Sequence, residues 1–532
     1  MPARRNDNSR YLSSGTRVDK IELGKFEHVG ALAVLCLTFF LVALDNTIVN
    51  VALPSLQRSL GSSTTALQWI TDAYTTAFAG LIVVGGHLAD RRGRREVLQS
   101  GLLAFIIGSL VAIFGNTNDV VIVARMIMGV GAALAVPASL SMLVDVFHSP
   151  IKRQTAIAGW TASAGIGVAM GPLVGGALLA YFWWGSIFWA NIVVAGLALA
   201  VSWVWLPKSA KRRHEPLDWK GSLLSVVALT SLVGGIIQAP EWGWSQPRIL
   251  GLFLVSAVAG GSFVVRAKQN SDRIVNFSIV RRNNFALASL AMGAIYLGIF
   301  GFLFLMTQFL QSYLGYSAFG AGLRFLPAAA AVVVGSALAR VLAPKLGPRL
   351  CLALGLVLML AAIAEEVLFS TSSTYLAVVG ILVPGGVSMG FVLTVGTDAV
   401  MGSLSDHETG IGAAINVAAM EVGGALGVAL FGSVFNSEYA RQLAPILAQL
   451  PQAAAGLVAS SLAAGLTVSR HIGGALGVAV GAQAHTAFMA GFAFAGWVGV
   501  SASALAALWV TAYMSHHSHD ANTAVERDLD TA

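Results

Sequence analysis

The sequence predicts an all-α polytopic membrane protein, because its composition and the spacing of its apolar segments both match a chain that crosses a bilayer many times. Of the 532 residues, 56% are hydrophobic and only 11% are charged. The mean hydropathy is +0.76. Such a chain has too few polar side chains to cover a water-soluble domain. Its apolar segments have the length of about 20 residues that a helix needs to span the hydrocarbon core.

Fourteen apolar segments of this length follow one another along the chain. They are predicted at 29–53, 67–88, 97–115, 119–143, 156–180, 184–206, 219–238, 248–266, 285–310, 320–343, 349–370, 374–398, 409–434 and 484–512. Residues 435–483 are expected to form an extracellular helical hairpin, because Arg470 and His471 interrupt a stretch at 456–482 that otherwise resembles a further span. An even number of spans places both termini on the same side.

The distribution of basic residues gives the orientation. Most of the 32 Lys and Arg residues fall in the tails and loops on the side of the N-terminus, whereas Arg58, Arg248, Arg441 and Arg470 fall on the other. Basic residues accumulate on the cytoplasmic side of membrane proteins. We therefore expect cytoplasmic tails at 1–28 and 513–532. The net charge of +7 then reflects membrane topology, and nucleic-acid binding is not expected.

Several classes of function are disfavoured by what the sequence lacks. It has no GxxxxGK[ST] phosphate loop and no soluble segment long enough for a nucleotide-binding domain, which favours an ion gradient over ATP as the energy source. It has no constellation typical of a catalytic nucleophile or a metal centre, so neither an enzyme nor a cofactor is expected.

Four ionisable residues lie inside predicted spans and are candidates for coupling a proton to a substrate: Asp45, Asp72, Arg125 and Glu421. A charge at bilayer depth costs roughly 2.5–3.5 kcal/mol on insertion scales, so it is expected to be paired, protonated or next to a polar cavity. Asp45, Asp72 and Arg125 are predicted at similar depth, about 8–12 Å from the outer surface. Arg125 is expected to pair with one aspartate, leaving the other free, although the sequence does not say which. A position for Arg125 at the outer rim is the alternative.

Other polar and aromatic residues have weaker signals. Glu365 and Glu366 lie near the outer end of a predicted span, where a rim position is favoured over a functional one. Aromatic residues in the spans could line a cavity that holds flat cations by cation–π contact, although each alone is as consistent with ordinary packing. The candidates for such a cavity are the aromatic residues Trp69, Tyr74, Trp160, Phe300 and Phe304, together with Met306.

Two glycine-rich motifs add more specific information. The first, GHLADRRGRR at 86–95, combines residues that permit a tight turn with residues that hold a loop at the cytoplasmic face; its key positions are Gly86, Asp90, Arg91, Gly93 and Arg94. The second, GVAMGPLVGG at 167–176, predicts a helix that bends and packs closely on a neighbour; its key positions are Gly167, Gly171, Pro172, Gly175 and Gly176.

Together with LDNTIVNVALP at 44–54 and the span around Arg125, these motifs resemble the fourteen-span drug:proton antiporters of the major facilitator superfamily. The likeness runs from about residue 30 to 515, and WITDAY at 69–74 is similar to exporters of quaternary ammonium compounds. WWGSIFWANIVV at 183–194 departs from the pattern, since it lacks the proline usual near its end. The resemblance implies that residues 86–95 act as a conformational loop, that 167–176 is the antiporter motif and that Arg125 is associated with proton coupling.

The resemblance also implies a domain organisation and a function. It implies two six-helix bundles, 29–206 and 267–512, joined by a linker at 207–266 that holds two additional central helices. A monomer in the bacterial cytoplasmic membrane is expected to export lipophilic drugs, with cations favoured, in exchange for protons. The alternatives are a dedicated exporter of a self-made antibiotic or of a neutral or lipid-like metabolite, and a non-transporting sensor. Asp72 disfavours neutral substrates, and the intact motifs disfavour a sensor.

Overall fold

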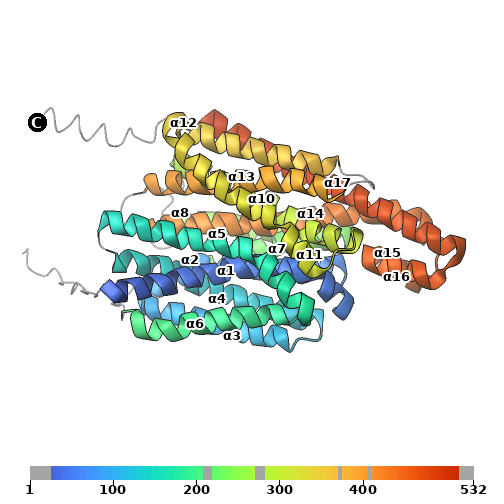
Figure 1. Ribbon diagram of the computed structural model, residues 1–532, viewed down its shortest axis with the longest axis horizontal. Helices are drawn as coiled ribbons and strands as arrows, with labels where there is room; N and C mark the ends of the chain where they lie inside the picture. Colours follow the sequence, from blue (N-terminus) through green and yellow to red (C-terminus); the bar gives the residue numbers. More distant parts are fainter. Residues whose placement is uncertain are drawn as a thin grey trace, which may run out of the picture.

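The computed structural model describes residues 25–147, 149–207, 219–269, 282–368, 374–404 and 409–514. Within these ranges every regular element is helical, and the long helices run side by side along the long axis of the molecule (Figure 1). Polar residues mark where several helices begin. For example, the side chains of Ser63 and Thr117 accept hydrogen bonds from the backbone N–H groups at the start of α2 and α4.

The helices form two groups with a pair between them. The first group contains α1 (Lys25–Leu60), α2 (Thr64–Arg92), α3 (Arg94–Ile113), α4 (Asn118–Val146), α5 (Pro150–Tyr181) and α6 (Ser186–Trp205). The second contains α10 (Asn283–Gln308), its π-helical continuation η1 (Phe309–Tyr313), α11 (Ala318–Arg324), α12 (Leu326–Val367), α13 (Tyr375–Gly402), α14 (Thr409–Leu447) and α17 (Gly474–Tyr513). Between them, α7 (Trp219–Trp242) packs on α2, on α14 and on its neighbour α8 (Pro247–Gln269).

The helices account for the fourteen expected spans. Twelve described helical segments are long and apolar enough to cross a membrane. One of them, Ala318–Val367, has 50 residues, and the helical path breaks at Gly347, where φ is 75°. This segment therefore contains two crossings. The polar first half of α2 keeps that helix out of the twelve, yet α2 has the length of a span and packs against α4, α7 and α14.

The segment between the last two spans contains two short helices, α15 (Gln452–Ser460) and α16 (Leu462–Ile472). Both are far shorter than a membrane span. They lie beside the extended ends of α14 and α17, at the end of the molecule opposite the start of α1 (Figure 1). No further crossing is present in the described part of this segment, and its extracellular location stays a prediction.

Candidate functional site

The centre of the first group holds an ion pair between Asp45 on α1 and Arg125 on α4. Arg125 Nη1 lies 2.5 Å from Asp45 Oδ2, and the two side chains are 1% and 0% exposed. Asn191 on α6 donates to the other oxygen, Asp45 Oδ1, at 2.6 Å, while Arg125 Nε donates to the carbonyl of Ile70 at 3.1 Å. The rim position considered for Arg125 is therefore wrong. Asp45 is the aspartate that pairs with it.

Close packing of α2 on α4 places an aromatic ring beside the Arg125 side chain of this pair. A Cβ at Gly129 would lie 2.4 Å from the carbonyl oxygen of Tyr74, so only glycine allows the two helices to approach so closely. The approach places the ring of Tyr74 4.3 Å from the guanidinium carbon of Arg125. Cation–π contact and hydrogen bonds thus surround a buried charge.

Asp72 on α2 has the opposite surroundings. Its side chain is buried, and neither carboxyl oxygen has a hydrogen-bond partner among the described residues. An ionised carboxylate without a partner is very costly in apolar surroundings, so such a group tends to take up a proton or bind a cation. The structure thus separates the two aspartates into a paired and an unpaired one.

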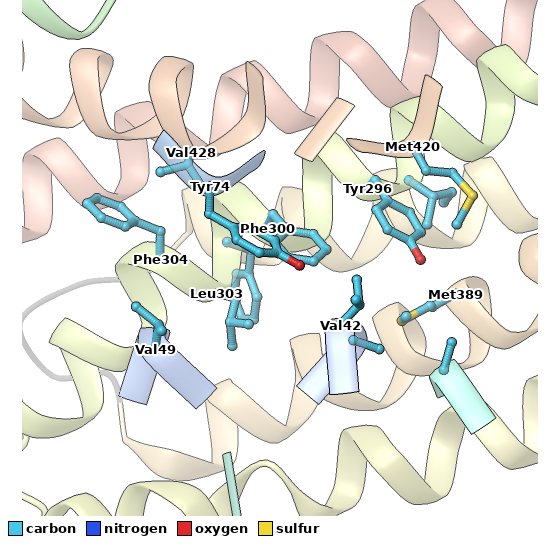
Figure 2. Packing of buried hydrophobic residues seen from close by; sticks show 14 of the residues in the cluster. Val42, Val49, Tyr74, Tyr296, Phe300, Leu303, Phe304, Met389, Met420 and Val428 are labelled. Carbon is cyan, nitrogen blue, oxygen red and sulfur yellow. The ribbon is translucent and has the colours of Figure 1, made fainter. Parts of the chain in front are cut away.

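Glu421 on α14 lies where the two groups of helices meet. Its side chain is 6% exposed, and Asn46 Nδ2 on α1 donates to its Oε1 at 3.4 Å. The carboxyl group lines a small cavity of about 20 Å³. Aromatic rings of Phe39, Tyr296 and Phe300 form much of its wall, and the last two are stacked with centroids 5.4 Å apart. In Figure 2 the hydroxyl end of Tyr296 points toward Met389.

A larger cavity of about 100 Å³ lies next to the small one, between α1 and α5 on one side and α10, α12 and α13 on the other. Its lining is apolar except for Thr47, and it includes Leu303 and Met389, which Figure 2 shows among the packed core residues. Val168 on α5 lines both cavities. An acidic cavity and an apolar one therefore adjoin at the interface between the two groups.

Of the five aromatic residues expected to form a substrate cavity, Phe300 lines the small cavity and the other four line neither cavity. Tyr74 packs on Arg125, and Phe304 is fully buried. Trp69 faces α7, where its ring lies 3.1 Å from the Cβ position of Gly234. Trp160 stacks on Phe39 with ring centroids 3.9 Å apart, so it supports the wall of the small cavity from behind. The number of residues along a span does not show which side of the helix a ring faces, and Phe39 and Tyr296 were missed for this reason.

The motif at 167–176 packs α5 tightly against two neighbours. A Cβ at Gly167 would lie 2.6 Å from the carbonyl oxygen of Phe40, and one at Gly171 would lie 1.9 Å from Thr47 Oγ1; both neighbours are on α1. Gly175 also faces α1, whereas Gly176 faces α11 across the interface between the groups. These glycines are therefore required by close helix contact.

Pro172 has a further effect on α5. It has no backbone N–H, so the carbonyl four residues earlier, that of Val168, loses its helical hydrogen bond. Thr47 Oγ1 on α1 lies 3.2 Å from this carbonyl oxygen and can donate to it. The same hydroxyl is within reach of the carbonyls of Ala43 and Leu44, at 3.3 and 3.2 Å. Three consecutive residues of α1 thus contact three different parts of the site. Asp45 forms the ion pair with Arg125, Asn46 donates to Glu421, and Thr47 contacts the motif at 167–176.

The motif at 86–95 is held to α4 by a small charge network. It was expected to be a loop, but it forms the last turns of α2 and the start of α3, with only Gly93 outside a helix. Gly93 has φ 114°, a conformation that favours glycine, and it separates α2 from α3. Arg94 pairs with Asp90 at 2.9 Å and with Asp145 on α4 at 2.5 Å. Arg91 is exposed. Gly86 has space beside it, with Pro137 Cβ at 3.6 Å from its Cβ position. The role of Asp145 was missed because nothing in the sequence pattern links 145 to 94.

One rim assignment is wrong. Glu366 on α12 is fully buried against Gly496 of α17, and neither of its oxygens has a hydrogen-bond partner among the described residues. Only Glu365, its neighbour, is partly exposed. Adjacent helical positions face directions about 100° apart, and depth along the span did not reveal which of the two faces the bundle.

The two groups of helices are joined at the end of the molecule that carries α15 and α16. Here Gln68 Nε2 donates to the carbonyls of Val428 and Ala429 at 3.3 and 3.0 Å. At the same end, Gln311 Nε2 donates to the carbonyl of Val51 at 2.8 Å. This conformer is closed at the end predicted to face outward.

The arrangement is that of a known transporter family, whose model, the Major Facilitator Superfamily, matches residues 35–428. The chain belongs to the major facilitator superfamily. This membership makes it a multi-pass membrane transporter rather than an enzyme. Among solved structures, it is similar to a bacterial homologue of the human lysosomal transporter Spinster, with a TM-score of 0.63 and 16% identity over 92% of this chain and 98% of that one. That likeness concerns the fold alone.

Several curated proteins that the chain is similar to are resistance proteins. The chain is 32% identical over 412 residues to the multidrug resistance protein Stp of Mycobacterium tuberculosis, covering 77% of this chain and 76% of Stp. It is 34% identical over 420 residues to the puromycin resistance protein pur8 of Streptomyces alboniger, covering 78% and 83%. It is 30% identical over 442 residues to the methyl viologen resistance protein SmvA of Salmonella typhimurium, covering 81% and 86%.

Proposed function

We propose that this major facilitator protein is a proton-coupled multidrug exporter that moves lipophilic cations across the bacterial cytoplasmic membrane by alternating access. The observation that carries this proposal is the position of Glu421, a buried carboxyl group at the interface of the two groups of helices, beside a cavity walled by aromatic rings. An acidic group next to aromatic faces suits a cation that is itself mostly apolar.

The three buried carboxyl groups have different roles in this proposal. Asp45 is neutralised by Arg125 and keeps the first group in one geometry, whereas Asp72 and Glu421 are free to exchange a proton for a cation. A proton entering from outside binds Glu421 when the outer end is open, and the cation replaces it when the inner end is open. A cation and a proton at the same carboxyl group compete, and this competition is the coupling.

The energetics favour more than one exchangeable acid. Each charge that crosses a potential of about 100 mV is worth about 2.3 kcal/mol. A monovalent cation exchanged for one proton moves no net charge, so the potential contributes only when a second proton travels. Asp72, which is buried without a partner, is our candidate for that second proton.

A dedicated exporter of one antibiotic or of a neutral metabolite is the second candidate, and the similarity to pur8 favours it. A neutral exported compound would leave the carboxyl groups of Glu421 and Asp72 without a cationic partner. We further propose that the protein acts as a monomer with both ends of the chain in the cytoplasm, in agreement with the basic residues near the start of α1 and at 91–95, where α2 ends and α3 begins.

The test is efflux of ethidium and of methyl viologen from energised bacterial cells that express the native protein. We expect efflux that a protonophore abolishes and that Glu421→Gln abolishes at equal protein level in the membrane. Efflux of both cations at the rate of cells without the protein would overturn the cationic assignment. Export of puromycin under the same conditions would then favour the second candidate.

A further inference from the structure

A line of buried polar side chains runs along α2 from the end of the molecule that carries α15 and α16, which is predicted to face outward. Thr64, Gln68, Asp72 and Thr76 follow one another at a spacing of four residues, and none is more than 4% exposed. Side chains four residues apart in a helix lie on one face, about 6 Å from one to the next. Apolar side chains would serve packing at a lower desolvation cost, so this line of polar groups calls for a function.

The inner members of the line have polar atoms without partners. Neither carboxyl oxygen of Asp72 and not the hydroxyl of Thr76 has a hydrogen-bond partner among the described residues. The buried acidic and basic side chains of the helices packed on α2 have partners of their own within the described ranges; these are Asp45 with Arg125, Glu421 with Asn46, and Glu438 with Arg441. Asp72 therefore depends on a proton that reaches it from elsewhere.

Gln68 closes the outer part of the line. Its Nε2 donates to the carbonyls of Val428 and Ala429 on α14, at 3.3 and 3.0 Å. Its Oε1 accepts a hydrogen bond from Asn436 Nδ2 on the same helix at 3.3 Å. These three hydrogen bonds, here called the Gln68 clasp, engage both polar atoms of the amide one helical turn outward of Asp72.

The neighbouring elements fit this amide closely. A Cβ at Gly432 on α14 would lie 2.4 Å from Gln68 Nε2, so the glycine leaves the space that the amide fills. One turn further out, Thr64 Oγ1 donates to the carbonyl of Ser460 on α15 at 3.2 Å. The clasp is therefore the last closure between Asp72 and the polar end of α2.

We propose that this line is a path by which protons reach Asp72 from the outer side, and that Gln68 is its gate. When the amide releases α14, water reaches Asp72 between α2 and α14, and a proton from that water binds the carboxyl group. When the Gln68 clasp forms again, the proton is enclosed. This inference rests on the proposed function, in which Asp72 carries the second proton.

The path is separate from the two cavities described above, because no residue of α2 lines either of them. Another contact closes the outer end beside the helices that wall the small cavity: Gln311 Nε2 of η1 donates to the carbonyl of Val51 on α1. A neutral amide suits a gate, since it exchanges its hydrogen bonds for bonds with water at a small net free energy. Asp72 can thus be reached while the contact between η1 and α1 stays closed.

The experiment measures how easily position 72 is reached from each side of the membrane. In the full-length protein, Cys36→Ala and Cys351→Ala remove the two native cysteines, and Asp72→Cys then introduces one. The probe is sulfonatoethyl methanethiosulfonate, an anion that labels thiols and does not cross the bilayer. Its labelling rate is measured in right-side-out and in inverted membrane vesicles.

Two variants open the gate in different ways. Gln68→Ala removes the amide, and Gly432→Ala pushes it out of its place against α14. The matched control is Gln311→Ala, which removes another buried amide that joins the two groups at the same end but away from α2.

We expect both gate variants to raise the labelling rate in right-side-out vesicles about tenfold, the change given by the loss of a favourable hydrogen bond from the closed state. The rate in inverted vesicles and the rate of the control should stay unchanged. An unchanged rate in either gate variant, or an equal rise in the control, would overturn the gate.

A second measurement keeps Asp72 in place. In proteoliposomes without drug, Gln68→Ala should admit protons down an imposed gradient several-fold faster than the native protein, because Asp72 then exchanges protons with the outer side in every conformer. Adding Asp72→Asn should remove the increase. An influx equal to that of the native protein, or an increase that survives Asp72→Asn, would overturn the proton path.

Neither measurement requires drug transport, so a negative result in both leaves the proposed export function standing. Absence of ethidium efflux by the native protein would instead overturn that function and leave the gate in place.

Discussion

Two buried carboxyl groups, those of Asp45 on α1 and Glu421 on α14, differ in how many hydrogen bonds they receive. Asp45 receives hydrogen bonds from both Arg125 and Asn191, at 2.5 and 2.6 Å, and lines neither of the two cavities described above. Glu421 receives one long hydrogen bond, 3.4 Å from Asn46, and faces a cavity. A saturated site holds its geometry, whereas an under-satisfied one next to open space can exchange partners. We therefore assign a structural role to the first and a carrier role to the second.

Breaking the saturated site is expected to have the largest effect. Arg125→Met leaves Asp45 buried without a counter-charge, and such a loss costs about 3–5 kcal/mol of stability. Thermal unfolding in detergent measures it. The matched double variant, Arg125→Met with Asp45→Asn, removes both charges and is expected to recover much of the loss. A single variant as stable as the native protein would contradict the structural role of the pair.

Neutralising Glu421 is expected to abolish transport and to leave the stability unchanged. Glu421→Gln removes the exchangeable proton but keeps the shape of the side chain, so cation transport falls to the level of empty vesicles while the unfolding temperature is retained. Glu366→Gln is the control, because Glu366 is equally buried but lines neither cavity. Proton-driven transport that survives in Glu421→Gln would assign the carrier role elsewhere, with Asp72 as the next candidate.

Close packing of α5 on α1 can be tested at Gly171. An alanine here would place its Cβ 1.9 Å from Thr47 Oγ1, so one helix or the side chain must move, which typically costs about 1–3 kcal/mol. Gly159→Ala is the matched control, since no atom lies within 4 Å of its Cβ position on the same helix. Unfolding temperature and transport rate should fall together for Gly171→Ala only. Equal behaviour of the two variants would argue against tight contact at this motif.

The fold was predictable from the sequence because hydropathy and basic residues report membrane crossings directly, and even the faint span α2 was found by its length. The candidate site was only partly predictable. Depth along a span follows from counting residues, so Asp45 and Arg125 were correctly placed at one level. Which side of a helix faces its neighbour does not follow from counting, and this is why Glu366 was misplaced at the rim and why Phe39 was missed in the cavity wall.

The motif at 167–176 illustrates the same limit. Its glycines predict a close contact but do not identify the helix that makes it, and the partnership of Thr47 with the carbonyl freed by Pro172 depends on two helices whose relative position is set by the whole bundle. A pattern that is local in sequence therefore has a meaning that only the tertiary structure supplies.

The smallest expected effect tests this partnership. Thr47→Val keeps the shape of the side chain but removes the hydroxyl, which leaves the carbonyl of Val168 unsatisfied and should cost about 1 kcal/mol in stability. Pro172→Ala restores a backbone N–H that can donate to the same carbonyl. In the Pro172→Ala background, Thr47→Val should lower the free energy of unfolding only a little. A double-mutant cycle measured by unfolding should therefore give a positive coupling energy between the two substitutions. Strict additivity of the two substitutions would show that Thr47 binds the carbonyls of its own helix instead.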